Sequence, residues 1–188
     1  MSMRKFIISL LLSLPSVVLA QQFTEYDRKV FNEGQFLTSS DLLFASGDIP
    51  WDPVSPIKVY SIHDEDDETI VTFSHSIYFD SQWVSFSKGI YIVDEDTGDR
   101  YKVRGYTGNL SMDRLLIIKY CKGRNVLISL RFPKFKRKVK TISIFNPGHE
   151  SDIKPSNRRD DYTLPLAYKV NVKALRKRYK EHKINVFE

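Results

Sequence analysis

A strand–turn–strand pattern over residues 83–105 is the feature that most constrains the fold of this chain. Residues 90–93 are β-branched or aromatic, and the segment 94–99 (Asp-Glu-Asp-Thr-Gly-Asp) has the polar residues and the glycine of a tight turn. Apolar and charged residues then alternate over 101–104. The segment therefore predicts a β-hairpin, because alternation with a period of two places apolar side chains on one face of a strand.

Other segments with the same period lie on both sides of this hairpin. Between Val71 and Phe79, apolar residues and His75 occupy the odd positions, which predicts a half-buried strand or two short strands that share a face. Further strands are predicted over 57–60, 115–118, 126–132 and 141–145. No long helical pattern separates them, so an all-β, antiparallel immunoglobulin-like β-sandwich is predicted over 56–146.

The two flanks of the predicted sandwich have a different character. Phe23, Tyr26 and Val30 have helical spacing, and residues 39–41 can cap a second helical turn over 42–44, so residues 21–55 are predicted to form a short helical N-terminal extension. Prolines over 49–56 predict an extended lead-in there. Residues 147–188 are predicted to hold a polar linker, an edge strand over 162–172 and a basic C-terminal helix over 173–183.

About ninety residues of this pattern resemble the β-sandwich domain of uncharacterised exported Bacteroidetes proteins. In that group the domain occurs alone or amino-terminal to a thioredoxin-like domain. The residues that carry the resemblance are Trp83 with Val84, Tyr91, Gly98, Tyr101, Gly105, Gly108, and Phe132 with Pro133. The resemblance implies a β-sandwich and export. It implies no thioredoxin activity, because this chain lacks a Cys-x-x-Cys pair.

The first twenty residues have the pattern of a signal peptide. Arg4 and Lys5 precede an apolar run over 6–14, and Val18 and Ala20 place small residues before a cut after Ala20. The run is too short for a transmembrane helix. We therefore expect an exported protein, periplasmic or at the cell surface.

Cysteine content and charge narrow the class further. The single cysteine, Cys121, cannot form an internal disulfide, which favours a bacterial envelope protein over a small disulfide-rich animal domain. The formal net charge falls from +6 to +4 once Arg4 and Lys5 are removed. A modest positive charge on an exported chain argues against nucleic acid as the partner.

The turn over 94–99 has carboxylates at alternate positions, as a calcium loop requires. Gly98 stands at the fifth position of such a loop rather than the sixth, and Gly105 occupies the twelfth, where a glutamate is required. Aspartate and glycine are also the residues that a hairpin turn needs. We therefore predict a plain turn and no metal or cofactor; the acidic run over 64–68 is interpreted as a solvated loop.

Catalysis would require a nucleophile with a histidine and an orienting acid, or a pair of carboxylates. His63, His149 and His182 lie in predicted loops or in the tail, whereas His75 falls on the apolar face of its strand. Cys121 has cations nearby that could lower the pKa of its thiol, but it has no resolving cysteine. Both residues are interpreted as structural, and no catalytic residue is predicted.

Two basic clusters remain, which are either a solvated turn and a solvated helix face or candidates for contact with an anionic surface or a partner. The residues predicted to make this contact are Lys134, Lys136, Arg137, Lys138, Lys173, Arg176 and Arg178. The leading hypothesis is a non-enzymatic binding module of the bacterial cell envelope, with a protein or an anionic envelope polymer as its partner. The alternatives are a periplasmic hydrolase or thiol-dependent enzyme using His75 or Cys121, and a structural protein that self-associates through an edge strand.

Overall fold

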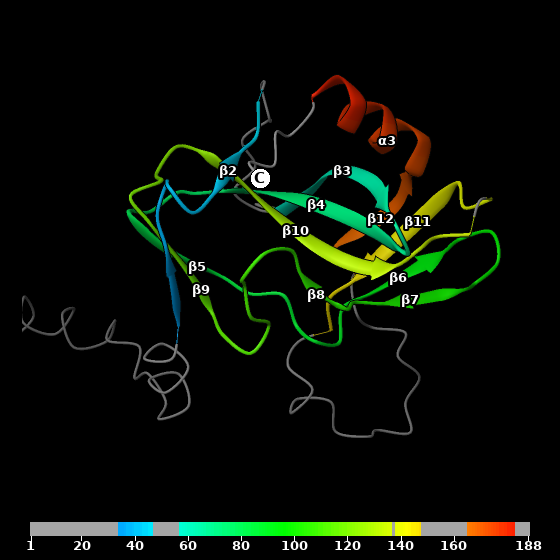
Figure 1. The fold of residues 1–188 in the computed structure, drawn as a ribbon, viewed down its shortest axis with the longest axis horizontal. Coiled ribbons are helices and arrows are strands. Elements are labelled where there is room, and N and C mark those ends of the chain that lie inside the picture. Colours follow the sequence, from blue (N-terminus) through cyan, green and yellow to red (C-terminus); the bar gives the residue numbers. More distant parts are fainter. Residues whose placement is uncertain (1–33, 47–56, 137, 148–164, 183–188) are drawn as a thin grey trace, which may run out of the picture. The chain divides into compact units, whose positions relative to one another are not determined.

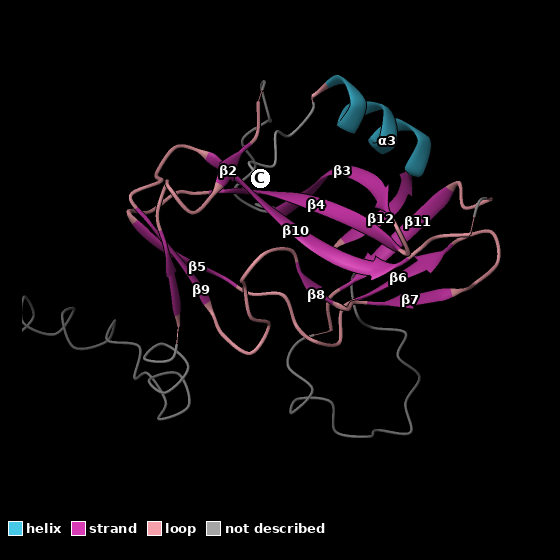
Figure 2. Ribbon diagram, viewed as in Figure 1, coloured by secondary structure: helices cyan, strands magenta, loops and turns pink. Residues whose placement is uncertain are grey.

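A computed structural model describes residues 34–46, 57–136, 138–147 and 165–182 (Figure 1). This part of the chain is mostly β-strand, in three sheets, with a single helix (Figure 2). The predicted signal peptide over 1–20, residues 21–33 and the proline-rich lead-in over 47–56 lie outside the described residues. The described residues all belong to one compact unit that begins at Gly34.

The first sheet has the strand order β2 (Leu43–Phe44), β10 (Asn125–Pro133), β4 (Glu68–Ser76) and β3 (Ile57–Glu65). The short strand β8 (Gly105–Tyr106) pairs with the same edge of β10 as β2 does, further along the strand. All of these pairings are antiparallel.

The prediction that the strand from Val71 is half-buried is wrong, because β4 is buried on both faces. Its polar positions are occupied by small hydroxyl side chains that find partners on β10. The hydroxyls of Thr72 and Ser129 lie 2.9 Å apart, and Ser76 donates to Asn125 Oδ1 over 2.6 Å. Short hydroxyl side chains can be buried when they are hydrogen-bonded in this way, so alternation with serine and threonine did not indicate a solvated face.

The second sheet has the order β12 (Ala167–Asn171), β11 (Thr141–Phe145), β6 (Tyr91–Asp94) and β7 (Arg100–Lys102). The β6–β7 hairpin confirms the strand–turn–strand prediction, with Ile92 opposite Tyr101. Gly98 has φ +76°, a conformation that glycine adopts without steric cost. The turn therefore depends on the residue type that the sequence supplies at this position.

The third sheet has the order β1 (Gln35–Leu37), β9 (Leu116–Lys119) and β5 (Ser81–Val84). The prediction of a helical extension is wrong over 34–46, where the chain forms β1, parallel to β9, and β2. Asp41 explains the difference, because its carboxylate accepts from the backbone N–H of Thr38 (2.8 Å) while its own N–H donates to the Thr38 carbonyl (3.0 Å). These bonds close a turn between the two strands instead of capping a helix.

The predicted basic helix is confirmed as α3 (Val172–Glu181), which packs against β3. Asn171 caps its first turn by accepting a hydrogen bond from Ala174 N over 2.9 Å. Val172 and Leu175 join the core formed by the strands, as Leu37 of β1 does. The segments on both sides of the predicted sandwich thus contribute apolar side chains to its core.

Candidate binding face

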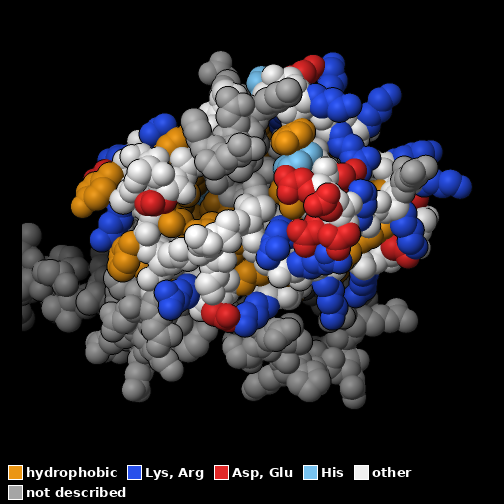
Figure 3. Space-filling model, viewed as in Figure 1, with side chains coloured by type: hydrophobic (Ala, Val, Ile, Leu, Met, Phe, Trp, Pro, Cys, Tyr) orange, Lys and Arg blue, Asp and Glu red, His pale blue; other side chains and the backbone are white. Residues whose placement is uncertain are grey.

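The structure places two of the predicted basic residues, Lys134 and Arg176, against the acidic hairpin between β3 and β4. Lys134 donates to the Asp66 carbonyl, and Lys136 pairs with Asp99 of the neighbouring β6–β7 turn at 2.6 Å. Lys138 is exposed, and Arg137 lies outside the described residues. Figure 3 shows the acidic side chains surrounded by cations on this part of the surface.

Two basic residues of α3 contact β3, which leads into this hairpin. Arg176 pairs with Asp64 at 2.8 Å, and Arg178 donates to the carbonyl of Tyr60 over 3.4 Å with its guanidinium 5.8 Å from the Tyr60 ring. Lys173 is exposed on the first turn of the helix. Several of the cations predicted to bind an external anion are therefore engaged with groups of the protein itself.

The acidic run over 64–68, which we interpreted as a solvated loop, is a tight hairpin held by ion pairs. Arg104 reaches Asp67 at 2.8 Å and Glu68 at 3.1 Å, and Arg131 approaches Glu68 at 3.8 Å. The hydrogen bond from Arg104 lowers the pKa of the exposed Asp67 carboxyl. The hairpin is thus tied to segments that follow it in the chain.

The carboxylates of the β6–β7 turn serve the turn. Asp94 is buried and accepts hydrogen bonds from Asp96 N (3.0 Å) and from the Thr97 hydroxyl (2.9 Å). The hydrogen bond from Lys136 lowers the pKa of Asp99. In the described ranges, no three His, Cys, Asp or Glu side chains are grouped so that they could hold a metal ion.

His75 is a buried side chain whose partner is an amide. Gln82 Nε2 lies 2.7 Å from His75 Nε2 and 3.1 Å from the Ser76 carbonyl, while the Gln82 oxygen accepts from Tyr78 N over 2.9 Å. Burial lowers the pKa of His75 to about 4, so its ring is neutral at pH 7 and Nε2 accepts the amide proton. Together with the other hydrogen bonds of Gln82, this contact fixes the segment between β4 and β5.

Cys121 is buried and donates its thiol hydrogen to the Lys119 carbonyl over 3.3 Å. It anchors the turn after β9, where Gly123 N donates to the Ile77 carbonyl (2.8 Å) and Ile77 N donates to Arg124 O (3.0 Å). The turn after β9 is therefore joined by backbone hydrogen bonds to the segment that His75 braces.

The third sheet and the turns beside it form an exposed surface that was not predicted from the sequence. Five large hydrophobic side chains are exposed in the described residues, and four of them belong to the third sheet or to the turns beside it. We call these four the aromatic face: Phe36 (50% exposed), Phe79 (65%), Trp83 (63%) and Tyr120 (79%). Hydrophobic side chains are visible on the left of Figure 3, the side on which Figure 1 labels β5 and β9.

The register of the third sheet places two of these rings in one row. Ile117 of β9 pairs with Phe36 on one side and with Trp83 on the other. Residues that are directly opposite share a face of a sheet, so the three side chains form an apolar strip across the strands, in which Phe36 and Trp83 are exposed and Ile117 between them is buried. Lys119, two positions further on the same face, holds its ammonium 4.4 Å from the centre of the Phe36 ring.

The other two rings lie in the turn between β4 and β5 and in the turn after β9. Phe79 lies between β4 and β5, Tyr120 follows β9, and Tyr120 N donates to the Asp80 carbonyl over 2.9 Å. Tyr120 has φ +60°, a left-handed conformation that costs about 1–2 kcal/mol for a residue with a Cβ. Such conformations persist where the surrounding structure enforces them, and they are concentrated at functional sites.

The sequence around Trp83 does not decide which face of its strand is buried. Gln82 and Val84 share the face opposite to Trp83, and one of them is polar while the other is apolar. Burial of Val84 places Trp83 on the outer face. The position of Phe36 beside it depends on a strand pairing between segments about eighty residues apart, which no local pattern contains.

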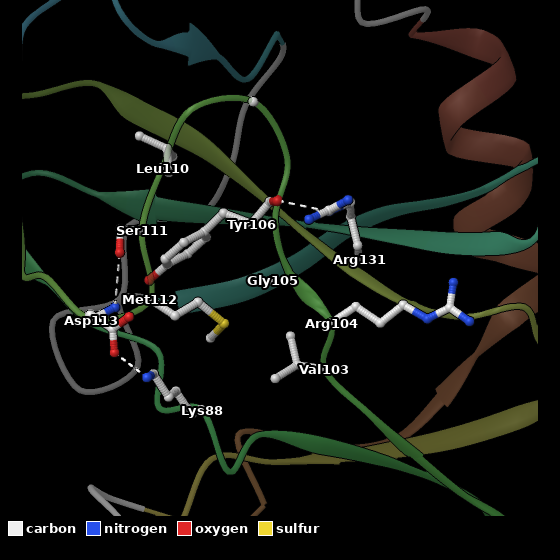
Figure 4. Close-up of a pocket in the computed structure, with 11 residues that line it drawn as sticks. Lys88, Val103, Arg104, Gly105, Tyr106, Leu110, Ser111, Met112, Asp113 and Arg131 are labelled. Atoms are coloured by element: carbon white, nitrogen blue, oxygen red, sulfur yellow. Dashed lines mark hydrogen bonds and ion pairs between the residues drawn. The ribbon is translucent and has the colours of Figure 1, made fainter.

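A pocket of about 470 Å³ lies beside β8 (Figure 4). Val103 and Met112 contribute apolar surface to it, and Lys88 and Asp113 form an ion pair at its edge. Arg131 Nε donates to the Tyr106 carbonyl over 2.9 Å. These charged groups are engaged with protein partners, so the pocket presents a mixed surface with no group aimed at a ligand.

Within the described residues, no helix is both long enough and apolar enough to cross a membrane. Comparisons with protein-family models, with curated proteins and with solved structures found no match for this chain.

Proposed function

We propose that this protein is an exported, non-enzymatic binding module of the bacterial cell envelope, and that it binds its partner through the aromatic face. The observation that carries the proposal is the concentration of exposed aromatic rings on one small sheet and its two turns. Exposed clusters of apolar side chains on a folded protein mark interaction surfaces. Tryptophan and tyrosine are also the residues that contribute most often to binding energy.

The strand order supports an immunoglobulin-like sandwich as the scaffold. In that fold one sheet has the order A-B-E-D and the other contains C, F and G, with C′ beyond C in variable-type domains. Here the first sheet has the order β3, β4, β10, β8 and the second has the order β12, β11, β6, β7. Read along the chain, these strands correspond to A-B-E-D and G-F-C-C′.

The aromatic face occupies additions to this scaffold. Strand β5 lies in the connection from β4 to β6, and β9 lies in the connection from β8 to β10. These correspond to the B–C and D–E connections of an immunoglobulin-like domain. Connections carried by a rigid sandwich are common sites of binding, and variable domains use their B–C loop in this way.

Export is supported by the signal-peptide pattern of residues 1–20 and by the resemblance to exported Bacteroidetes β-sandwich proteins. A hydrolase or thiol-dependent enzyme is supported less well. His75 and Cys121 are both buried, and each hydrogen-bonds a group that shapes the turns under the aromatic face. Their buried positions suit a structural role in fixing these turns, whereas a catalytic residue must be accessible to a substrate.

The proposal can be tested by sedimentation of purified mature protein with isolated cell-envelope material. We expect the wild-type protein to sediment with the envelopes, and a Trp83→Ala, Tyr120→Ala double variant to remain largely in solution. Tyr168→Ala is the matched control, because Tyr168 is also 63% exposed but lies on β12 of the second sheet. Equal sedimentation of the double variant and the wild type would refute a binding role for this face.

A further inference from the structure

We infer that the ligand of the aromatic face is a polysaccharide with acidic groups, whose sugar rings stack on the aromatic side chains. This inference rests on the proposed function and names the chemistry of its partner. Sugar rings have apolar C–H faces and a polar edge of hydroxyl groups, so they require a surface with both characters. The aromatic face combines flat rings with exposed polar side chains at short intervals along the same strands.

The apolar strip has the geometry of a stacking platform. Adjacent strands are about 4.8 Å apart, so Phe36 and Trp83, on the outer strands of a three-stranded sheet, are about 10 Å apart at their backbones. This separation is close to the length of a disaccharide unit in an extended chain. A polysaccharide that crosses the strands can therefore place one sugar ring against Phe36 and a later one against Trp83, on either side of the buried Ile117.

Polar groups line the strip on the side of the two turns. Ser81 and Lys119 form the next outward-facing pair of the sheet, and Ser81 is exposed. Asp80 is exposed in the adjacent turn. A hydroxyl, an ammonium and a carboxylate supply donors and acceptors for sugar hydroxyl groups.

The charge around the platform favours an acidic polymer. The segments 79–84 and 119–124 contain three cations (Lys119, Lys122 and Arg124) and one carboxylate (Asp80), a local net charge of +2. Lys122 and Arg124 are exposed. Cations on the surface attract anionic polymers in a manner that salt screens.

A lipid surface fits the same rings less well. Asp80 follows Phe79 directly, and its exposed carboxylate would have to enter an apolar layer with the ring. Burying a charge among lipids is unfavourable. The same carboxylate remains solvated when a sugar chain lies flat on the sheet.

Hydrogen bonds fix the two turns that carry Phe79 and Tyr120, which reduces the conformational entropy that these side chains lose when a ligand binds. The backbone N–H of Tyr120 donates to the Asp80 carbonyl of the turn between β4 and β5, and Gln82 fixes that turn, which carries Phe79, through His75 and Tyr78. Side chains on fixed turns have less freedom to lose when they bind. Rigid platforms suit ligands that contribute flat, repeated units.

The decisive experiment uses the same sedimentation assay with envelopes treated with periodate, which cleaves sugar rings at vicinal hydroxyl groups. We expect periodate treatment to abolish sedimentation of the wild-type protein. In affinity electrophoresis, the acidic polysaccharide fraction released from the envelopes should retard the wild-type protein. Trp83→Ala and Tyr120→Ala should each weaken this retardation at least about ten-fold, while Trp83→Tyr and Tyr168→Ala should preserve it.

A second set of variants separates charge from stacking. Lys119→Gln combined with Lys122→Gln should weaken binding and reduce its dependence on salt. The matched control is Lys177→Gln with Lys180→Gln on α3, which removes the same charge from another part of the surface and should leave binding unchanged.

The outcomes separate this inference from the function on which it rests. Undiminished sedimentation with periodate-treated envelopes, or binding of the protein to phosphatidylglycerol vesicles in place of the polysaccharide fraction, would overturn the polysaccharide and leave the binding face standing. Undiminished sedimentation of the aromatic variants with untreated envelopes would overturn both. The thermal unfolding midpoint of each variant verifies that a loss of binding is not a loss of fold.

Discussion

Gln82 of β5 and His75 of β4 are joined by a 2.7 Å hydrogen bond, and this bond connects the third sheet to the first. The histidine accepts the bond at Nε2 in its neutral form, so its Nδ1 carries the proton and finds no partner in the described part of the chain. A buried histidine that must stay neutral makes the stability of the protein depend on pH.

We predict that the free energy of unfolding falls as pH decreases from about 6.5 to about 4. The pKa of His75 is lowered from 6.5 to about 4 by burial, so the unfolded chain binds a proton in this range that the folded chain does not. A shift of that size corresponds to about 3 kcal/mol. Urea unfolding at a series of pH values measures the loss.

His75→Gln should flatten this dependence, because glutamine does not titrate. The exposed carboxyls of Asp67 and Asp99, whose pKa values are lowered by Arg104 and Lys136, add their own losses only at lower pH. A variant with the same slope as the wild type above pH 4 would show that another group causes the dependence.

We predict that Tyr120→Gly stabilises the protein while it weakens binding. Tyr120 has φ +60°, and its side chain is 79% exposed, so glycine relieves strain and loses little packing. The expected gain is about 0.5–1 kcal/mol after the entropy of glycine is counted. Tyr120→Ala keeps the strained backbone and should give no such gain in urea unfolding. Equal stabilities of the two variants would contradict the assignment of strain.

We predict that the Cys121 thiol reacts with thiol reagents only when the protein unfolds. Its side chain is buried and its hydrogen is donated to Lys119 O. The labelling rate should therefore follow the unfolding equilibrium as urea is added. Lys122→Cys places a second thiol at an exposed neighbouring position, and this thiol should react at once in the native protein. Rapid labelling of both thiols without urea would contradict this prediction and favour the alternative of a thiol-dependent enzyme.

We predict that Asp94→Ala destabilises the protein by about 1–3 kcal/mol, since it removes the buried acceptor of two hydrogen bonds in the β6–β7 turn. Asp96→Ala, at an exposed position of the same turn, should change stability by less than about 0.5 kcal/mol. Addition of calcium should change neither result. An increase in wild-type stability with calcium that Asp94→Ala abolishes would indicate a cation site.

We predict that Leu175→Ala destabilises the protein by about 2–5 kcal/mol, because Leu175 is buried in the core on α3. Lys173→Ala, on the exposed side of the same helix, should have little effect. Thermal unfolding of the two variants measures the difference. Equal midpoints would show that α3 is a peripheral appendage.

Much of the β-structure could be predicted because its strands carry their own signals. Strands β6, β10 and β11 show alternating or β-branched residues between turn residues, and α3 follows a capping asparagine. Strands β1 and β2 were missed because a short segment with Ser-Ser-Asp is equally compatible with a turn and with a helix cap. The pairing with β9 and β10 decides between them, and that pairing is tertiary.

The candidate site could not be predicted for a related reason. Charge clusters are visible in a sequence, and they directed attention to Arg176 and Lys136, whose partners Asp64 and Asp99 are distant in the chain. The aromatic face is assembled from single residues of separate segments. Each residue alone has the character of an ordinary core residue until the sheet register places it outside.

The ion pair between Asp64 and Arg176 spans 112 positions of the chain, and it has a consequence for the order in which the molecule folds. Contacts between distant positions require the closure of large loops and form late. Strand β3 emerges early during synthesis, yet the helix that packs against it comes after all the other strands. We therefore expect the core to be completed only after α3 has been synthesised.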